Sequence, residues 1–199
     1  MKSISILLIF ILINTLLFAQ GNFKTQITTA KQSYSTGKLE DAHFALQQAL
    51  QELDIIVGKE VLKLMPQKLD SLASNPREDH VSANAGFIGA TIHRSYGRQG
   101  KVSVEIINNS PLIASLNTFL SSSLLGGMAR DENTKVVKVQ GYKARLEKQG
   151  ESSDGKPNYN LQIPFNGALM TITANELDET QVLSIANSFP LDNIAKLIQ

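Results

Sequence analysis

Apolar residues between positions 39 and 64 recur at spacings of three and four, which places them along one face of an α-helix. A shorter helical pattern covers about residues 24–35 and ends at Ser35-Thr36-Gly37. The two patterns predict a helical hairpin that turns there and ends at Met65-Pro66, because proline disfavours helical geometry in the residue before it. The apolar stripe of the second helix consists of Leu39, Ala42, Leu46, Ala49, Leu50, Leu53, Ile56, Val57 and Leu64.

The pattern changes after the hairpin. Residues 67–84 are polar and interrupted by Pro76, which predicts a linker with a short helical piece. The apolar period then becomes two, which predicts two strands joined by a turn at 97–100. Their alternating apolar residues are Ile88, Ala90 and Ile92, then Val102, Val104 and Ile106. Ser110-Pro111 predicts the start of a helix that stops near Gly126-Gly127, because serine caps free N–H groups and proline suits the first helical position.

Two more strands are expected at about 135–140 and 142–148. Their apolar residues have opposite parity: Val137 and Val139 in the first, Tyr142 and Leu146 in the second. Keeping all of them on the core face predicts a β-bulge at Gly141.

Asn166-Gly167 is a strong signal for a two-residue hairpin turn. Pairing outward from it places six apolar residues on one face, so the turn and the hydrophobic pattern predict the same register. The expected pairs are Phe165–Ala168, Ile163–Met170 and Leu161–Ile172. Pro164 lacks an N–H and therefore indicates a strand near a sheet edge. A final helix is expected over residues 175–188.

These elements predict an α+β protein, in which an N-terminal helical hairpin precedes a mostly antiparallel sheet of about six strands covered by helices. The predicted organisation is a signal peptide at 1–20, the hairpin at 21–66, a linker at 67–84 and an α+β domain at 85–199. Whether helices cover one face of the sheet or both is left open by the pattern.

The first 20 residues show the pattern of a secretory signal peptide. Lys2 precedes an apolar run from Ile4 to Phe18, and the small residue Ala19 follows it. The run of about 15 residues is shorter than the ~20 of a membrane-spanning helix, so a cleaved signal is expected rather than an uncleaved anchor. We therefore expect export to the periplasm or the extracellular space, with no integral membrane span after cleavage.

Composition narrows the classes of function. The chain has 199 residues, of which 42% are hydrophobic and none is cysteine. Disulfides, thiolate metal sites and cysteine nucleophiles are therefore excluded. The 19 basic and 18 acidic residues nearly balance, which disfavours nucleic-acid binding. His43, His80 and His93 lack the spacing of a metal motif, so we expect no metal and no cofactor.

Five short motifs, in this order, resemble those of a set of small exported bacterial proteins of unknown function. They are Met65-Pro66, Arg94-Ser95-Tyr96, Ser110-Pro111, Gly141 to Ala144 and Leu191-Asp192. The α+β part also resembles PsbP-like domains, which are mostly accessory or ligand-binding modules. The resemblance implies a helical hairpin joined to an α+β domain, and it implies no catalytic residue.

His93 is the histidine with candidate partners. If residues 97–101 form the loop between the two strands, His93 lies opposite Glu105 and Ser95 lies opposite Ser103. A shift of two residues would instead place His93 opposite Ser103. A histidine and a carboxylate beside serines can form a hydrolase site. The alternative is a cross-strand charge pair on a solvated face.

Basic residues gather between positions 135 and 148 and can extend to the turn after the first strand. Together they can form a basic patch for an anionic glycan, a phospholipid headgroup or an acidic protein. The alternative is that lysines on strands prevent edge-to-edge aggregation. The candidate binding residues are Arg94, Tyr96, Arg98, Lys138, Lys143 and Arg145.

The leading hypothesis is a non-catalytic interaction or ligand-binding module of the bacterial envelope. Its expected partner is an envelope protein or a small or anionic ligand, and either the sheet face or the hairpin is expected to carry the contact. One alternative is a small hydrolase that uses His93 and Glu105. Another is a carrier of an apolar molecule, which requires an internal cavity between the sheet and the helices.

Overall fold

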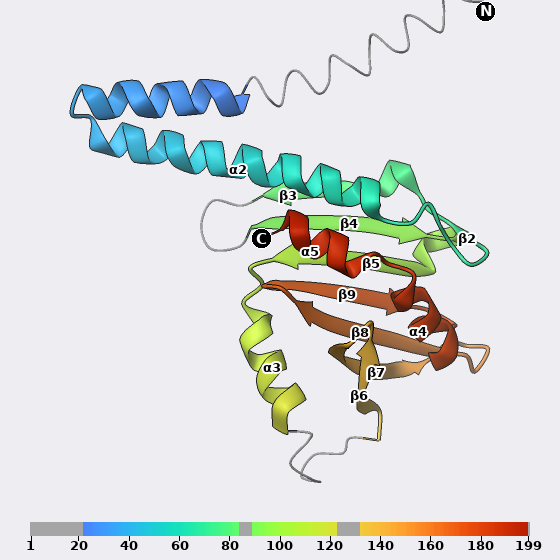
Figure 1. Cartoon of the computed structure of the whole chain (residues 1–199). Coiled ribbons are helices and arrows are strands. Elements are labelled where there is room, and N and C mark those ends of the chain that lie inside the picture. The colour runs from blue at the N-terminus through green and yellow to red at the C-terminus, as the bar shows by residue number, and fades with distance from the viewer. Residues whose placement is uncertain (1–21, 84–88, 123–131, 199) are drawn as a thin grey trace, which may run out of the picture.

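A computed structural model describes residues 22–83, 89–122 and 132–198. The chain is an α+β protein, as predicted, with an N-terminal helical hairpin followed by a seven-stranded antiparallel sheet (Figure 1). The strand order across the sheet is β3-β4-β5-β9-β8-β7-β6.

The helices and strands have the following bounds. The described part of α1 covers residues 22–35. The other helices are α2 (Leu39–Leu64), α3 (Leu112–Ser122), α4 (Glu179–Asn187) and α5 (Leu191–Leu197), with short 3-10 turns η1 (Pro76–Glu78) and η2 (Arg98–Gly100). The sheet contains β3 (His80–Ala83), β4 (Ala90–Tyr96), β5 (Val102–Asn108), β6 (Thr134–Val139), β7 (Tyr142–Glu151), β8 (Pro157–Phe165) and β9 (Ala168–Ala174). A separate two-stranded hairpin consists of β1 (Lys68–Leu69) and β2 (Leu72–Ala73).

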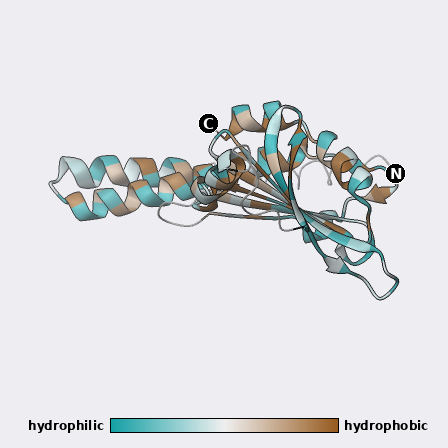
Figure 2. Cartoon of the chain, turned by 90° about the horizontal axis from the view of Figure 1, so that it is seen from below, coloured by the Kyte–Doolittle hydropathy of each residue, from teal (hydrophilic) through white to brown (hydrophobic). Residues whose placement is uncertain are grey.

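The predicted helical hairpin is present. Helix α1 lies alongside the N-terminal half of α2, and the pair projects beyond the sheet (Figures 1 and 2). Small buried alanines, among them Ala30, Ala42 and Ala49, allow the two helices to approach closely. Gly37 makes the turn between them with a φ of +75°, a conformation that glycine adopts without steric cost. We call this projecting pair, residues 22–53, the helical arm.

The C-terminal half of α2 packs on β3 and β4. Gly58 and Val61 are buried in this half of the helix, and so is Met65, which directly follows it. A Cβ at position 58 would lie 2.5 Å from Cγ1 of Val81 on β3, so glycine allows the helix to lie against the sheet at this point.

Residues 67–83 are not a linker. The predicted short helical piece is present as η1, but the segment also supplies β1, β2 and β3. Backbone bonds tie it to the end of β4: Asn75 N donates to Ser95 O at 2.9 Å, and Gly97 N donates to Ala73 O at 2.8 Å. The sequence pattern predicted six strands, and β3 is the strand of the seven that it did not predict. An edge strand with one solvent-exposed face carries few apolar residues, so its pattern is weak.

The two faces of the sheet differ. The core face is covered by the C-terminal half of α2 together with α4 and α5, and the main hydrophobic core lies between them. On the opposite face, which we call the outer face, the covering helix among the described residues is α3. Leu116 and Leu120 of α3 pack there on Leu169 in a second, small apolar cluster. Most of the outer face therefore stays polar.

The register predicted around Asn166-Gly167 is confirmed for all three pairs. Pro164 was expected to lie in a strand near a sheet edge, but β8 is third from the β6 edge and has β9 and β7 as neighbours. The pairing of β8 with β7 extends only as far as Gln162, so the missing N–H of Pro164 costs no bond to β7.

The β-bulge predicted at Gly141 is also wrong. Gln140 and Gly141 form a tight two-residue turn with φ values of +49° and +90°, and Val139 pairs directly with Tyr142. Such a turn places the two flanking residues opposite each other on the same face, which explains the change of parity without a bulge. The bulge in β7 lies between Lys148 and Glu151 instead.

The bounds of some predicted elements differ from the expectation, and two predicted features lie outside the described residues. The helix expected over residues 175–188 is α4, which begins at Glu179 because Asp178 and Gln181 form a capping box; α5 follows it and was not predicted. Ile88 and the expected helix stop at Gly126-Gly127 lie outside the described residues.

Candidate functional site

A row of polar side chains crosses the outer face of the sheet. The strand register places these residues opposite one another in neighbouring strands, and they are exposed or half-buried. In order from β3 to β7 they are His80, His93, Glu105, Thr171, Gln162 and Arg145. The row contains residues from both candidate sites of the sequence analysis: His93 and Glu105 of the catalytic hypothesis, and Arg145 of the basic patch.

The first of the two registers considered for β4 and β5 is confirmed: His93 lies opposite Glu105, and Ser95 lies opposite Ser103. The Ser95 hydroxyl is nevertheless engaged elsewhere, since it donates to a carboxylate oxygen of Glu78 and accepts from the Asn75 amide at 3.0 Å. Ser95 is also buried. Its hydroxyl therefore lacks the histidine contact that would activate a serine nucleophile.

Arg94 and Tyr96 lie on the core face, not on an accessible basic patch. Arg94 is 4% exposed, and its guanidinium binds Asp79 and donates to the carbonyls of Leu62 and Met65 at 3.0 and 3.2 Å. The hydrogen bond to Asp79 raises the pKa of Arg94. Arg94 has the same parity as Ala90 and Ile92 in the sequence, so a strict count along β4 would have placed it inward.

Tyr96 is fully buried, and its hydroxyl donates to the carbonyl of Pro66 at 2.9 Å. Burial raises its pKa to about 12. Together with Arg94, it ties the end of α2 to the C-terminal end of β4. Arg94 and Tyr96 of the motif Arg94-Ser95-Tyr96 thus anchor the helical hairpin to the sheet.

Lys138, Lys143 and Arg145 gather at one corner of the outer face. Lys138 lies directly opposite Lys143 on the neighbouring strand, and Arg145 follows two residues later on the same face. Arg98 is exposed in η2, at the far end of β4 and four strands away in the sheet order. Of the six candidate binding residues, the three on β6 and β7 therefore form a basic corner, and the other three lie elsewhere.

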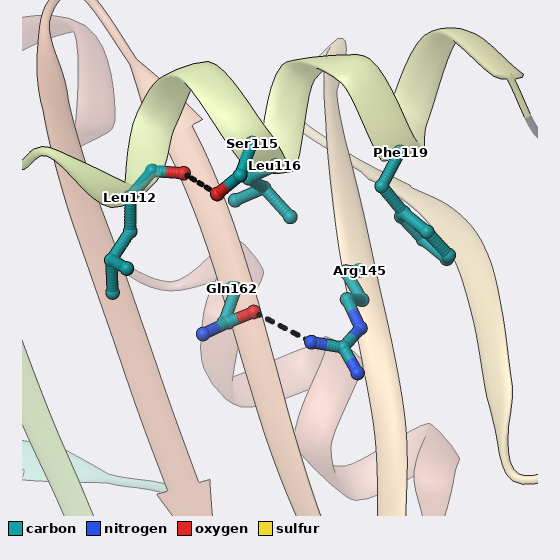
Figure 3. A pocket seen from close by; sticks show the side chains of 6 residues that line it. All are labelled: Leu112, Ser115, Leu116, Phe119, Arg145 and Gln162. Atoms are coloured by element: carbon teal, nitrogen blue, oxygen red, sulfur yellow. Dashed lines mark hydrogen bonds between the residues drawn. The ribbon is translucent and has the colours of Figure 1, made fainter.

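The basic corner borders a pocket of about 250 Å³ beneath α3 (Figure 3). The guanidinium of Arg145 lies 5.4 Å from the centre of the Phe119 ring. It also donates to the Gln162 side chain at 3.4 Å and forms an ion pair with Glu147 at 3.0 Å. Sequence reasoning missed Phe119 and Gln162, because only the fold brings α3 over β7 and β8.

The helical arm is a second notable surface. Nine large hydrophobic side chains are exposed among the described residues, and seven of them lie on the arm. They are Ile27, Tyr34, Leu39, Phe44, Leu46, Leu50 and Leu53, with exposed fractions from 41% to 71%. Figure 2 shows apolar stretches along both projecting helices. The arm therefore carries most of the large apolar side chains that are exposed in the described part of the chain.

Two further searches bear on the possible chemistry. Within the described ranges, no group of three or more histidine and acidic side chains is arranged to hold a metal ion. In the same part of the chain, no helix combines the length and apolar character that crossing a bilayer requires. Comparisons with protein-family models, curated proteins and solved structures find no match.

Proposed function

We propose that the chain is an exported interaction module that binds a partner protein through its helical arm. The observation that carries this proposal is the gathering of seven of nine exposed large hydrophobic residues on the arm. Exposed apolar surface is unfavourable in water, and covering it drives most protein association. The sheet domain supports the arm by holding the C-terminal half of α2 in the core.

The spacing along α2 indicates the shape of the partner. Leu39, Leu46, Leu50 and Leu53 are separated by seven, four and three residues, which is the a and d spacing of a coiled-coil seam. Their side chains are 64%, 49%, 62% and 41% exposed. We call these four leucines the seam. A narrow seam of this kind accepts the apolar face of another helix by knobs-into-holes packing.

The residues that flank the seam indicate the charge of the partner. Glu40, Gln47 and Asp54 each follow a seam leucine by one position, where coiled coils carry the residues that pair across helices. The Asp54 carboxylate is partly shielded from solvent, and this burial raises its pKa. An antiparallel pair of two copies would bring these acidic flanks together. The proposed partner is therefore an amphipathic helix with lysine or arginine beside its apolar face.

Export is part of the proposal. The basic, apolar and small-residue pattern of residues 1–20 supports it, and so does the resemblance to small exported bacterial proteins and PsbP-like domains. The mass of the protein purified from its own cells tests it. A mass that lacks the first 19 to 21 residues supports export, whereas the intact mass contradicts a cleaved signal.

The binding test compares leucines on and off the arm. The mature protein is used to isolate a partner from envelope extract, and the affinity of the purified pair is measured by calorimetry. Leu46→Ser with Leu50→Ser should weaken binding at least about tenfold, because full burial of a leucine contributes about 1.5–3 kcal/mol and about half of each side chain is still exposed in the free protein. The matched control is Leu197→Ser, an exposed leucine at 38% on α5. Equal affinity of both variants would contradict the proposal.

A further inference from the structure

The pocket beneath α3 combines an apolar wall with polar groups on its floor. Leu112, Leu116 and Phe119 project from α3 over Gln162 and Arg145 of the sheet (Figure 3). Its volume of about 250 Å³ exceeds the ~150 Å³ of an apolar cavity that takes up benzene. The pocket is therefore large enough for a small ring or a short aliphatic chain.

Arg145, on the floor of the pocket, has hydrogen-bond donors that are not in use. A guanidinium carries five N–H donors in a planar fork. Glu147 and Gln162 engage the two terminal nitrogens, at 3.0 and 3.4 Å. The Nε atom is buried and has no hydrogen-bond partner. A buried donor without a partner is unfavourable, and an acceptor in the pocket would relieve it after a small side-chain movement.

The charges around Arg145 favour an anion. Lys138 and Lys143 lie directly opposite each other, an arrangement that is destabilising for like charges. Both are exposed, and neither forms an ion pair within the described part of the chain. Three cations therefore stand against the single carboxylate of Glu147, a formal surplus of two positive charges at this corner.

We propose that this pocket binds a small monocarboxylate with an apolar body. The carboxylate lies against the planar fork of Arg145, which matches its two oxygens, and Lys143 adds long-range attraction. The apolar body fills the space between Leu112, Leu116 and Phe119. This site is separate from the helical arm and does not depend on the function proposed for it.

The test titrates the mature protein with benzoate, with benzyl alcohol as the uncharged analogue and acetate as the analogue without an apolar body. Amide NMR signals of α3 and the Gln162 side chain report on binding. We expect benzoate to bind at least about tenfold more tightly than either analogue, because each analogue lacks one half of the recognition. Equal shifts with benzoate and benzyl alcohol would contradict a carboxylate site.

Two variants locate the site. Arg145→Gln should weaken benzoate binding about tenfold or more, while Arg98→Gln, which changes the same residue type in η2, should leave it unchanged. Ser115 is exposed and lines the pocket, so Ser115→Tyr places a large side chain in it while Arg145 is kept, and it should abolish binding even if Arg145→Gln perturbs folding. Benzoate binding that survives Ser115→Tyr would overturn the proposal.

Discussion

Arg94 and Asp79 form a two-point ion pair beneath the C-terminal end of α2. Nε of Arg94 lies 2.9 Å from one carboxylate oxygen and Nη2 lies 2.5 Å from the other. The remaining terminal nitrogen donates to the carbonyls of Leu62 and Met65. One side chain thus joins three parts of the chain: the end of α2, the segment before β3 and the C-terminal end of β4.

Breaking this ion pair should destabilise the protein strongly. Arg94→Gln leaves the Asp79 carboxylate without its partner in a nearly buried place, and loss of one partner of a buried pair costs about 3–5 kcal/mol. Urea unfolding followed by circular dichroism measures this loss. Lys63→Gln, which removes an exposed ion pair with Glu60, is the control and should change stability by less than about 0.5 kcal/mol. A small effect of Arg94→Gln would show that the pair does not hold α2 to the sheet.

Ionisation of Tyr96 should lower the free energy of unfolding at alkaline pH. Burial raises its pKa from the usual 10.0 to about 12, so the folded protein holds the phenol proton more tightly than the unfolded chain does. Its contribution is complete below pH 10 and is lost as the pH rises towards 12. Tyr96→Phe should flatten the decline between these values, while the smaller part from Tyr142, whose pKa is also raised by burial, remains. Identical slopes for wild type and variant would contradict this assignment.

The close approach of α2 to β3 can be tested at Gly58. Alanine is the better helix former by about 1 kcal/mol, but its Cβ would lie 2.5 Å from Cγ1 of Val81 and 3.2 Å from Cγ1 of Ile92. Overpacking of this kind costs about 1–3 kcal/mol, so Gly58→Ala should destabilise the protein.

A double-mutant cycle separates these two effects. Val81→Ala removes the clashing methyl group, so Gly58→Ala should become neutral or stabilising in that background, with a coupling of about 1 kcal/mol or more. Purely additive effects would mean that residues 67–83 do not pack against α2 as a part of the sheet.

Local signals were sufficient for some elements. The apolar spacing of three and four along α2 and the Asn166-Gly167 turn are encoded by near neighbours, so the hairpins and the register of β8 with β9 could be predicted from the sequence. The pair of His93 with Glu105 was one of two registers that the sequence left open, and the structure has that one.

Other features depend on contacts between distant segments. Strand β3 is polar because only one of its faces meets the core, so residues 67–83 looked like a linker. Arg94 looked like a surface cation because its partner Asp79 and the carbonyls of α2 come from other elements. The pocket depends on the placement of α3 over Arg145 and Gln162, which no spacing in the sequence reports.

The seam leucines should contribute little to the stability of the isolated protein. Leu46→Ser with Leu50→Ser should change the free energy of unfolding by less than about 1 kcal/mol, because both side chains are about half exposed or more. Ala49→Leu is the contrasting variant. It places a large side chain at a position only 2% exposed between α1 and α2 and should destabilise the arm by about 1–3 kcal/mol. A large loss in the seam variant would mean that these leucines are structural.

Site-specific photocrosslinking tests the central claim, that the arm binds a partner helix, most directly. A photoreactive amino acid is placed at Leu50 on the seam or at Leu197 on α5, and cells that make the protein natively are irradiated. The account predicts a discrete adduct with another protein at Leu50, crosslinked through a helix with basic flanks, and no such adduct at Leu197. An adduct of two copies of this chain, or the same products at both positions, would contradict it.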